Sequence, residues 1–279
     1  MGKLLKSSVR NSVKPEKKSS SVSEKKGFIK SLKEKFSFLR WLDPFTYVDL
    51  FVMPRVKKIT KSEFVENIVN VFFAALFAFL FYTILGILFG SSTPLVIVYS
   101  ASMEPELYRG DVIGLSSANE KMNFGPEVVL NQNINNVPTY LFAEPVYSSS
   151  GDLLKIVFSN GQDIFPEKSS RIIVYSSFPA GIPIIHRTIA HIKASDGEFV
   201  LTKGDNVVTN STFDADCGKI INGRTEKSCI TLFAIPVKQI QGVAFFNIPK
   251  VGCAKLWLVD DLLSLVSTGK LPSDFRGIC

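Results

Sequence analysis

The feature that most constrains this chain is a long apolar run without charged side chains, from Asn67 to Met103. Its middle, residues 68–89, consists mostly of Phe, Leu, Ile, Val and Ala. Roughly 20 apolar residues in a helix cross the ~30 Å hydrocarbon core of a bilayer. The run therefore predicts a transmembrane helix over residues 67–90, and Gly90 and Pro94 end this helix and turn the chain.

The charges of the chain are distributed unevenly around this run. Residues 1–66 hold 16 Lys or Arg and 7 Asp or Glu, whereas the whole chain has a net charge of only +7. So basic a segment would suit nucleic acid, but it has no groove-reading motif and directly precedes the apolar run, so no nucleic-acid partner is expected. Basic flanks of membrane spans stay cytoplasmic. We therefore expect a single span in the lipid bilayer, with residues 1–66 inside and residues 91–279 outside.

Residues 1–66 show three patterns in turn. The first 26 residues are rich in Ser and Lys and are expected to be disordered. Residues 28–39 have the pattern of a basic amphipathic helix, and residues 41–53 are aromatic but interrupted by acidic residues and a proline. We interpret this part either as a segment lying on the cytoplasmic leaflet or as a small packed hairpin. The late start and the length of the apolar run argue against a cleaved signal peptide.

Beyond the span, the chain reads as short β-rich runs separated by turn residues, which predicts a mainly antiparallel β domain. Residues 116–170 are rich in Asn, Pro, Gly and Ser and are interpreted as an insertion with one or two hairpins. One helix is expected over residues 254–266, lying on the β domain or on the membrane surface. The β-rich runs are residues 112–115, 153–158, 171–175, 199–202 and 240–246.

All four cysteines lie beyond the span, which suggests an oxidising exterior and disulfide bonds. Three pairings are open, and Cys217–Cys229 with Cys253–Cys279 closes the shortest loops. Free buried thiols are the alternative. With no Cys-x-x-Cys and only two histidines in the chain, no metal site and no cofactor are expected.

Three short motifs follow the apolar run. The first is Ser-Ala-Ser-Met-Glu-Pro at residues 100–105, the second ends in His-Arg at residues 182–187, and the third is Thr-Lys-Gly-Asp-Asn at residues 202–206. In this order, behind a membrane anchor, they resemble the type I signal peptidases of the archaeal and endoplasmic-reticulum branch. The bacterial branch has a lysine where this chain has His186. The resemblance covers residues 99–256.

That resemblance implies an antiparallel β-sheet catalytic domain that cleaves signal peptides from exported preproteins after small residues. It implies a location in the cell membrane, or in the endoplasmic-reticulum membrane of a eukaryote, with the translocation channel as an expected partner. Two alternatives stay open. One is a narrowly specialised relative that processes one class of surface-protein precursor, and the other is a non-catalytic relative that binds signal sequences.

The candidate nucleophile is Ser102, whose hydroxyl needs a base. The histidines of the chain are His186 and His191. Along one continuous strand their odd spacing places the two rings on opposite faces, so that only one of them can face Ser102. The resemblance selects His186 as the general base, and His191 is expected to be a partly exposed structural residue.

The acid that orients the base is less well defined. The resemblance implies an aspartate about six residues after the Gly-Asp-Asn aspartate, but Ser211 occupies that position. The next acids are Asp214 and Asp216. We predict that Asp214 orients His186, with Asp216 as its rival and Asp205 as a supporting residue in the turn. Both rivals also fit a simple role as loop acids near a disulfide.

Two further residues belong to the expected site. The Ser100 hydroxyl is predicted to form an oxyanion hole with the backbone N–H of Ser102, although a serine that caps its own backbone explains the same position. Lys203 is the alternative base in the bacterial style, but a role in the scaffold of the turn suits it better.

Overall fold

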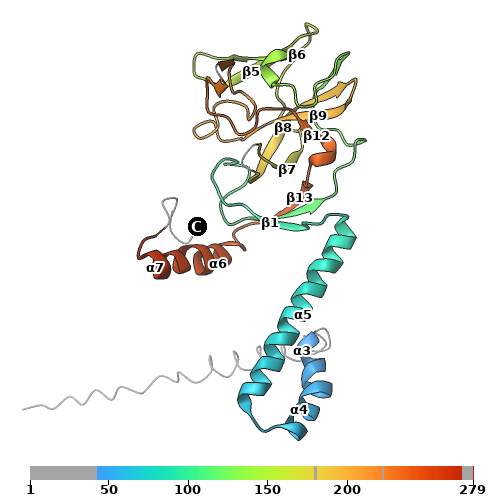
Figure 1. Ribbon diagram of the computed structural model, residues 1–279, viewed down its shortest axis with the longest axis vertical. Helices are drawn as coiled ribbons and strands as arrows, with labels where there is room; N and C mark the ends of the chain where they lie inside the picture. Colours follow the sequence, from blue (N-terminus) through green and yellow to red (C-terminus); the bar gives the residue numbers. More distant parts are fainter. Residues whose placement is uncertain (1–42, 179–180, 222, 272–278) are drawn as a thin grey trace, which may run out of the picture. The chain divides into compact units, whose positions relative to one another are not determined.

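The computed structural model describes residues 43–178, 181–221, 223–271 and 279. It divides into two compact units, residues 1–81 and residues 82–279 (Figure 1). The expected disorder of the first 26 residues and the amphipathic helix expected over residues 28–39 lie outside the described residues.

In the described part of the first unit, a helical stretch packs against the long apolar helix. Asp43 caps this stretch, because its side chain accepts a hydrogen bond from the Phe45 backbone at 3.0 Å. The ring of Phe45 then meets the ring of Phe77 edge to face, with centroids 5.6 Å apart. This ring contact lies within the first unit. Its elements are α3 (Pro44–Tyr47), η1 (Val48–Val52), α4 (Met53–Ile59) and α5 (Glu63–Phe89).

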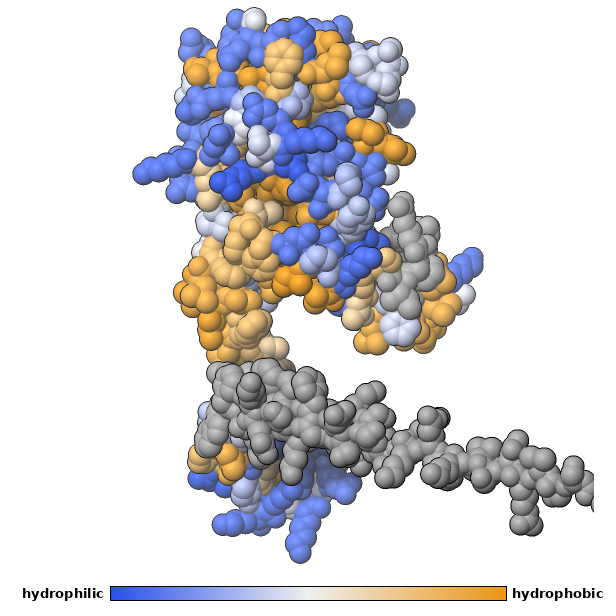
Figure 2. Space-filling view, turned by 180° about the vertical axis from the view of Figure 1, so that it is seen from behind, coloured by the Kyte–Doolittle hydropathy of each residue, from blue (hydrophilic) through white to orange (hydrophobic). Residues whose placement is uncertain are grey.

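Helix α5 contains 27 residues, none of them buried. At about 1.5 Å per residue it is ~40 Å long, and it is long and apolar enough to cross a membrane. It begins one turn earlier than the span expected from the sequence, and the extra turn carries Glu63 and Glu66, which interact favourably with a helix N-terminus. Figure 2 shows the apolar surface of α5 where grey atoms do not cover it.

The second unit is built on an eight-stranded sheet in the order β1-β2-β13-β7-β8-β9-β12, and β3 pairs with the far half of β8. All of its strand pairs are antiparallel except β3 with β8. This confirms the mainly β, antiparallel fold expected from the sequence. The strands are β1 (Leu95–Ile97), β2 (Val112–Ser116), β3 (Glu127–Leu130), β7 (Ile172–Ser176), β8 (Pro183–Ala194), β9 (Gly197–Lys203), β12 (Ile235–Pro236) and β13 (Gly242–Ile248).

Two small sheets complete the β structure. The segment interpreted as an insertion provides β3 and a three-stranded antiparallel sheet, β4-β5-β6. The other small sheet is a short hairpin within the loop between β9 and β12. Two 3-10 turns, η2 (Thr139–Leu141) and η3 (Val237–Gln239), connect strands. The remaining strands are β4 (Ala143–Tyr147), β5 (Leu153–Phe158), β6 (Asp163–Ile164), β10 (Ile220–Ile221) and β11 (Arg224–Thr225).

The structure pairs Cys217 with Cys229 and Cys253 with Cys279, which is the pairing that closes the shortest loops. The expected late helix is also present, as α6 (Cys253–Lys255), η4 (Leu256–Asp261) and α7 (Leu262–Thr268). Its start rests on the β domain: Leu256 is buried, and the Gly252 N–H donates to the Gly110 carbonyl at 2.8 Å.

Candidate active site

The segment that carries Ser102 leaves the edge of the main sheet and is anchored by apolar side chains. Strand β1 pairs with β2, and the backbone N–H of Val98 continues this pairing by donating to the Asp111 carbonyl. Met103, directly after the serine, is completely buried and packs with Val98 and Leu107. Ser102 is therefore half-buried on a segment that the core holds from both sides.

The turn after β9 holds the same segment from the other side. The side chain of Asn206 donates to the Ala101 carbonyl at 2.8 Å, and its backbone N–H donates to the Ser102 carbonyl at 3.0 Å. A Cβ atom on Gly204 would lie 2.6 Å from the Ser102 carbonyl oxygen. The third motif thus approaches the Ser102 segment closely because residue 204 lacks a side chain.

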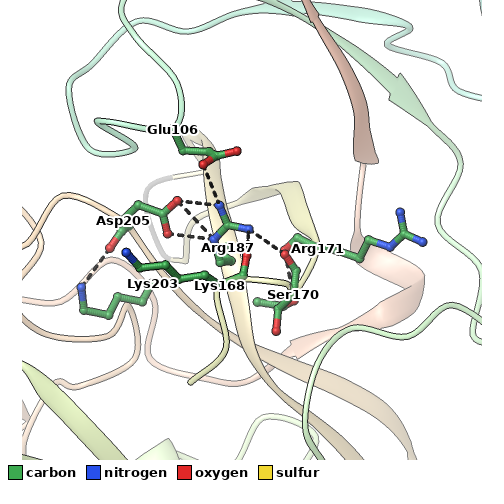
Figure 3. A network of polar contacts seen from close by, with 9 residues as sticks. Glu106, Lys168, Ser170, Arg171, Arg187, Lys203 and Asp205 are labelled. Atoms are coloured by element: carbon green, nitrogen blue, oxygen red, sulfur yellow. Dashed lines mark hydrogen bonds and ion pairs between the residues drawn. The ribbon is translucent and has the colours of Figure 1, made fainter. Parts of the chain in front are cut away.

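Asp205, in the same turn, binds the arginine that follows His186. The Arg187 guanidinium forms a bidentate pair with the Asp205 carboxylate, with an Nη2–Oδ2 distance of 2.7 Å and an Nε–Oδ1 distance of 2.9 Å. It also donates to the carbonyls of Lys168 and Ser170. Figure 3 shows these contacts converging on Arg187. The pair ties the histidine strand to the turn that holds the Ser102 segment, and the carboxylate of Asp205 thus binds the arginine rather than the imidazole.

His186 is buried in β8, with 2% of its surface exposed. Its Nδ1 atom lies 2.7 Å from Oδ2 of Asp214, in the loop that follows β9. The same carboxylate oxygen accepts hydrogen bonds from the hydroxyls of Tyr175 and Thr202. Burial alone raises the pKa of Asp214, but the charge of His186 and these hydrogen bonds outweigh it and hold the pKa below its usual value.

Asp216 points to different partners. Its carboxylate accepts a hydrogen bond from the Tyr147 hydroxyl at 2.6 Å and pairs with the Lys227 ammonium at 3.1 Å. The Cys217–Cys229 disulfide begins at the next residue. Of the two rival acids, the structure brings only Asp214 into contact with the histidine.

The prediction for His191 needs a correction. It is buried, with 3% of its surface exposed, its Nε2 lies 2.9 Å from the Glu198 carboxylate, and its ring meets Phe124 edge to face. It does not lie on the opposite face of the sheet from His186. A bulge at Ile189 inserts one residue into β8, which cancels the odd spacing. The cross-strand neighbours of the two histidines, Ile173 and Val200, belong to one apolar cluster.

Ser102 and His186 line one cavity of about 240 Å³. The walls of this cavity are mostly aliphatic and include Val96, Ile184 and Ile230. The Ser100 hydroxyl lies at the rim and donates to the Ser102 hydroxyl oxygen at 3.1 Å, which leaves the proton of Ser102 available to another acceptor. The cavity thus combines a hydroxyl, a buried imidazole and apolar walls.

Lys203 does not line this cavity. Its ammonium donates to the Gly204 carbonyl at 2.9 Å and borders a separate cavity with Asp205 and Asp152. Burial lowers the pKa of Lys203, and the neighbouring carboxylates oppose that shift. Among the described residues, no group of three or more His, Cys, Asp or Glu side chains lies together as metal ligands would.

No role was assigned from the sequence to the hydroxyls of Tyr175 and Thr202: Tyr175 only ends a β-rich run, and Thr202 ends another and begins the third motif. Nothing in the local pattern marks either hydroxyl, because both depend on a loop acid that returns to the sheet from more than ten residues away.

No family model matches the chain. Signal peptidase complex catalytic subunit SEC11 from the Saccharomyces cerevisiae strains YJM789, RM11-1a and JAY291 is 24% identical over 197 residues. The match covers 70% of this chain and 84% of the yeast protein. The chain is thus a homologue of a signal peptidase catalytic subunit, which agrees with its resemblance to the type I signal peptidases of the archaeal and endoplasmic-reticulum branch.

Proposed function

We propose that this protein is a membrane-anchored serine endopeptidase that removes signal peptides from exported preproteins. The observation that carries this proposal is the buried His186–Asp214 pair, which lies beside Ser102 at one cavity. In the proposed mechanism Ser102 attacks the scissile carbonyl, and His186 takes the proton and returns it to the leaving amine. Asp214 orients the imidazole and compensates its positive charge.

The protonation states follow from the geometry. An ionised carboxylate only accepts hydrogen bonds, so the Nδ1 atom of His186 carries the proton that is shared with Asp214. The Nε2 atom is then free to accept the proton of Ser102. The contact between Nδ1 and Asp214 thus selects the tautomer that can act as a base.

The oxyanion hole remains part of the proposal. The backbone N–H of Ser102 and the hydroxyl of Ser100 are the proposed donors to the developing negative charge. Ser100 is exposed and two residues before the nucleophile, so its hydroxyl can turn from Ser102 towards a substrate carbonyl. Ser100→Ala is then expected to lower kcat while leaving KM nearly unchanged.

The membrane location supports the same function. Helix α5 is long and apolar enough to serve as an anchor, with residues 1–66 proposed to be cytoplasmic and the β domain outside. A substrate tethered by its own apolar helix would meet a site tethered in the same membrane, which raises the effective concentration. The aliphatic cavity walls suit small side chains before the cleaved bond. Association with the translocation channel is part of this proposal.

The feature that favoured a non-catalytic relative was the missing aspartate at position 211. The loop is longer here, and Asp214 lies at the histidine instead, so the catalytic alternative is the better supported. The other alternative, a relative that processes one class of surface-protein precursor, differs from this proposal only in its substrates and uses the same catalytic chemistry.

The test is cleavage of a preprotein by the purified full chain in detergent, with the product identified by mass spectrometry. Ser102→Ala should lower the rate by three orders of magnitude or more, since binding and the oxyanion hole alone remain. Ser117→Ala, outside the cavity, is the matched control and should cleave normally. Normal processing by Ser102→Ala would overturn the proposal.

A further inference from the structure

Besides His186, two further side chains hold the carboxylate of Asp214. Its Oδ2 atom lies 2.7 Å from His186 Nδ1, 2.7 Å from the Tyr175 hydroxyl and 2.6 Å from the Thr202 hydroxyl. Tyr175 and Thr202 are 0% and 1% exposed, so neither hydroxyl exchanges this bond for one to bulk water. Two buried hydroxyls therefore converge on the atom that contacts the imidazole.

We propose that Tyr175 and Thr202 are positioning residues that hold Asp214 ionised and fix its Oδ2 atom on His186. They act through the aspartate and touch neither the substrate nor the nucleophile. This inference rests on the proposed function, in which Asp214 orients the general base.

The two hydroxyls come from the strands on either side of the histidine strand. Tyr175 lies on β7 and Thr202 on β9, and both strands pair with β8. The backbone of Asp214 is fixed independently, because its N–H donates to the Thr202 carbonyl at 2.8 Å and its carbonyl accepts from Ile230 and Thr231. With the backbone held, only the side-chain torsions of Asp214 are left, and the two hydroxyls fix them.

Three donors on one oxygen suit a carboxylate, which accepts several bonds, better than a neutral acid, which must donate one. Burial, and then the charge of Asp214, raises the pKa of Tyr175, so this hydroxyl remains a donor. The groups in contact with the Asp214 carboxylate are His186 from β8, Tyr175 from β7 and Thr202 from β9. The ammonium of Lys203, also on β9, interacts with the charge of Asp214.

A second tyrosine–aspartate pair provides a matched control, and its aspartate, Asp216, lies two residues after Asp214. The Tyr147 hydroxyl donates to Asp216 at 2.6 Å, and burial together with this bond raises the pKa of Tyr147. The chemistry of this pair is the same, but its carboxylate binds Lys227 rather than a histidine. Tyr147→Phe thus removes the same atom without touching the proposed site.

The first experiment measures preprotein cleavage by the full chain in detergent. Tyr175→Phe and Thr202→Val should each lower kcat about 10-fold, as expected for the loss of one hydrogen bond to a charged group, with KM changed less than about twofold. Thr202→Ser keeps the hydroxyl and should recover most of the rate. Tyr147→Phe should leave kcat within about twofold of the unmodified chain.

The second experiment does not require activity. The chain has two histidines, so the ring N–H protons of a histidine-labelled sample give two signals, which His191→Gln assigns. Tyr175→Phe should move or broaden the His186 Nδ1–H signal and leave the His191 signal in place. Tyr147→Phe should change neither signal.

The two readouts separate the inference from the function on which it rests. If the unmodified chain cleaves nothing but Tyr175→Phe alters the His186 signal, the proposed function fails and the positioning role stands. If cleavage is normal and Tyr175→Phe matches Tyr147→Phe in kcat and in the histidine spectrum, the positioning role is overturned. A loss in Tyr175→Phe that appears only as a lower melting temperature, with kcat per folded molecule unchanged, overturns it as well.

Discussion

The two ends of strand β8 each carry a buried histidine that contacts a carboxylate. His186 meets Asp214 at 2.7 Å, and His191 meets Glu198 at 2.9 Å. Both side chains lie on the same face of the sheet because of the bulge at Ile189. Burial and an acidic partner are therefore not what distinguishes a catalytic candidate in this molecule.

The difference lies in what surrounds each pair. At the first end, the imidazole lines a cavity with Ser102, and its acid is almost completely buried beneath two hydroxyls. At the second end, the imidazole packs on Phe124, and the side chain of Glu198 is 25% exposed. A partly exposed carboxylate is solvated by water, whereas a buried one depends on protein donors for its charge. Burying the charge of Asp214 costs folding free energy, and a catalytic role for that charge accounts for its being kept. We therefore propose the catalytic role for the His186–Asp214 pair rather than for the His191–Glu198 pair.

Replacing the two histidines tests this comparison most strongly. His186→Ala should lower kcat by about 10³-fold or more, since the hydroxyl of Ser102 loses its base. His191→Gln should retain most of the activity, because its side chain makes no contact at the cavity. Preprotein cleavage at saturating substrate, normalised to the folded fraction, measures both changes. Equal losses in the two variants would break the comparison.

The acids give the next largest effect. Asp214→Asn should preserve the fold and lower kcat by ~10³–10⁴, because an amide favours the wrong tautomer and leaves the imidazolium uncompensated. Asp216→Asn should be mild, since Asp216 contacts Tyr147 and Lys227 rather than the histidine. The same cleavage assay, with circular dichroism to verify folding, ranks them. A severe Asp216→Asn with a mild Asp214→Asn would transfer the role to Asp216.

The two ends of β8 also show what the sequence could and could not predict. The apolar run and the alternating β-rich segments predicted α5 and the antiparallel sheet, because such patterns depend on local periodicity. The Ser, His-Arg and Gly-Asp-Asn motifs identified the residues that meet around Ser102. The bulge at Ile189 has no local signal, so the odd spacing of the histidines predicted the wrong face for His191.

The contacts of Asp214 could not be predicted from local sequence patterns, for a related reason. The acid sits in a lengthened loop, and its place at His186 is set by Tyr175, Thr202 and the backbone of residues 230–231. These partners come from three separate segments of the chain. Motif spacing alone left Asp214 and Asp216 as rivals, and only the folded arrangement separates their contacts.

The pH dependence of cleavage distinguishes His186 from Lys203 as the base. Asp214 has a depressed pKa and so stays ionised even at the low end of its usual titration range, so that its protonation does not limit activity near neutral pH. With an imidazole as the base, activity should rise as the base loses its proton and reach a plateau before the range in which an amine titrates. The kcat/KM of the unmodified chain, measured between about pH 5 and 9, gives this pH profile.

If Lys203 were the base, the pH profile of cleavage would be different. Burial lowers its pKa, yet an amine base becomes active only as its ammonium loses the proton. Activity that rises only above about pH 8.5 would therefore indicate a lysine. Lys203→Met would then abolish cleavage, whereas under our proposal it should reduce activity only modestly, by loosening the turn.

The smallest effect concerns the two turns that flank β9. Gly204, at the His186 end, has no room for a side chain: a Cβ there would lie 2.6 Å from the Ser102 carbonyl oxygen and 2.7 Å from the Asn210 side chain. Gly204→Ala should therefore push the nucleophile segment away from the imidazole. We expect kcat to fall about 10-fold, in line with the sensitivity of positioned groups to small displacements.

Gly197, the first residue of β9 at the His191 end, is the matched control. Its φ of +147° strains any other residue, but a Cβ would only touch the ring of Phe199 at 3.6 Å. Gly197→Ala should therefore lower the melting temperature while kcat per folded molecule stays the same. Cleavage and thermal unfolding measured on both variants separate the two effects. If Gly197→Ala lowers kcat as much as Gly204→Ala does, strain travels along β9 from one end to the other, and the two ends of the strand are not independent.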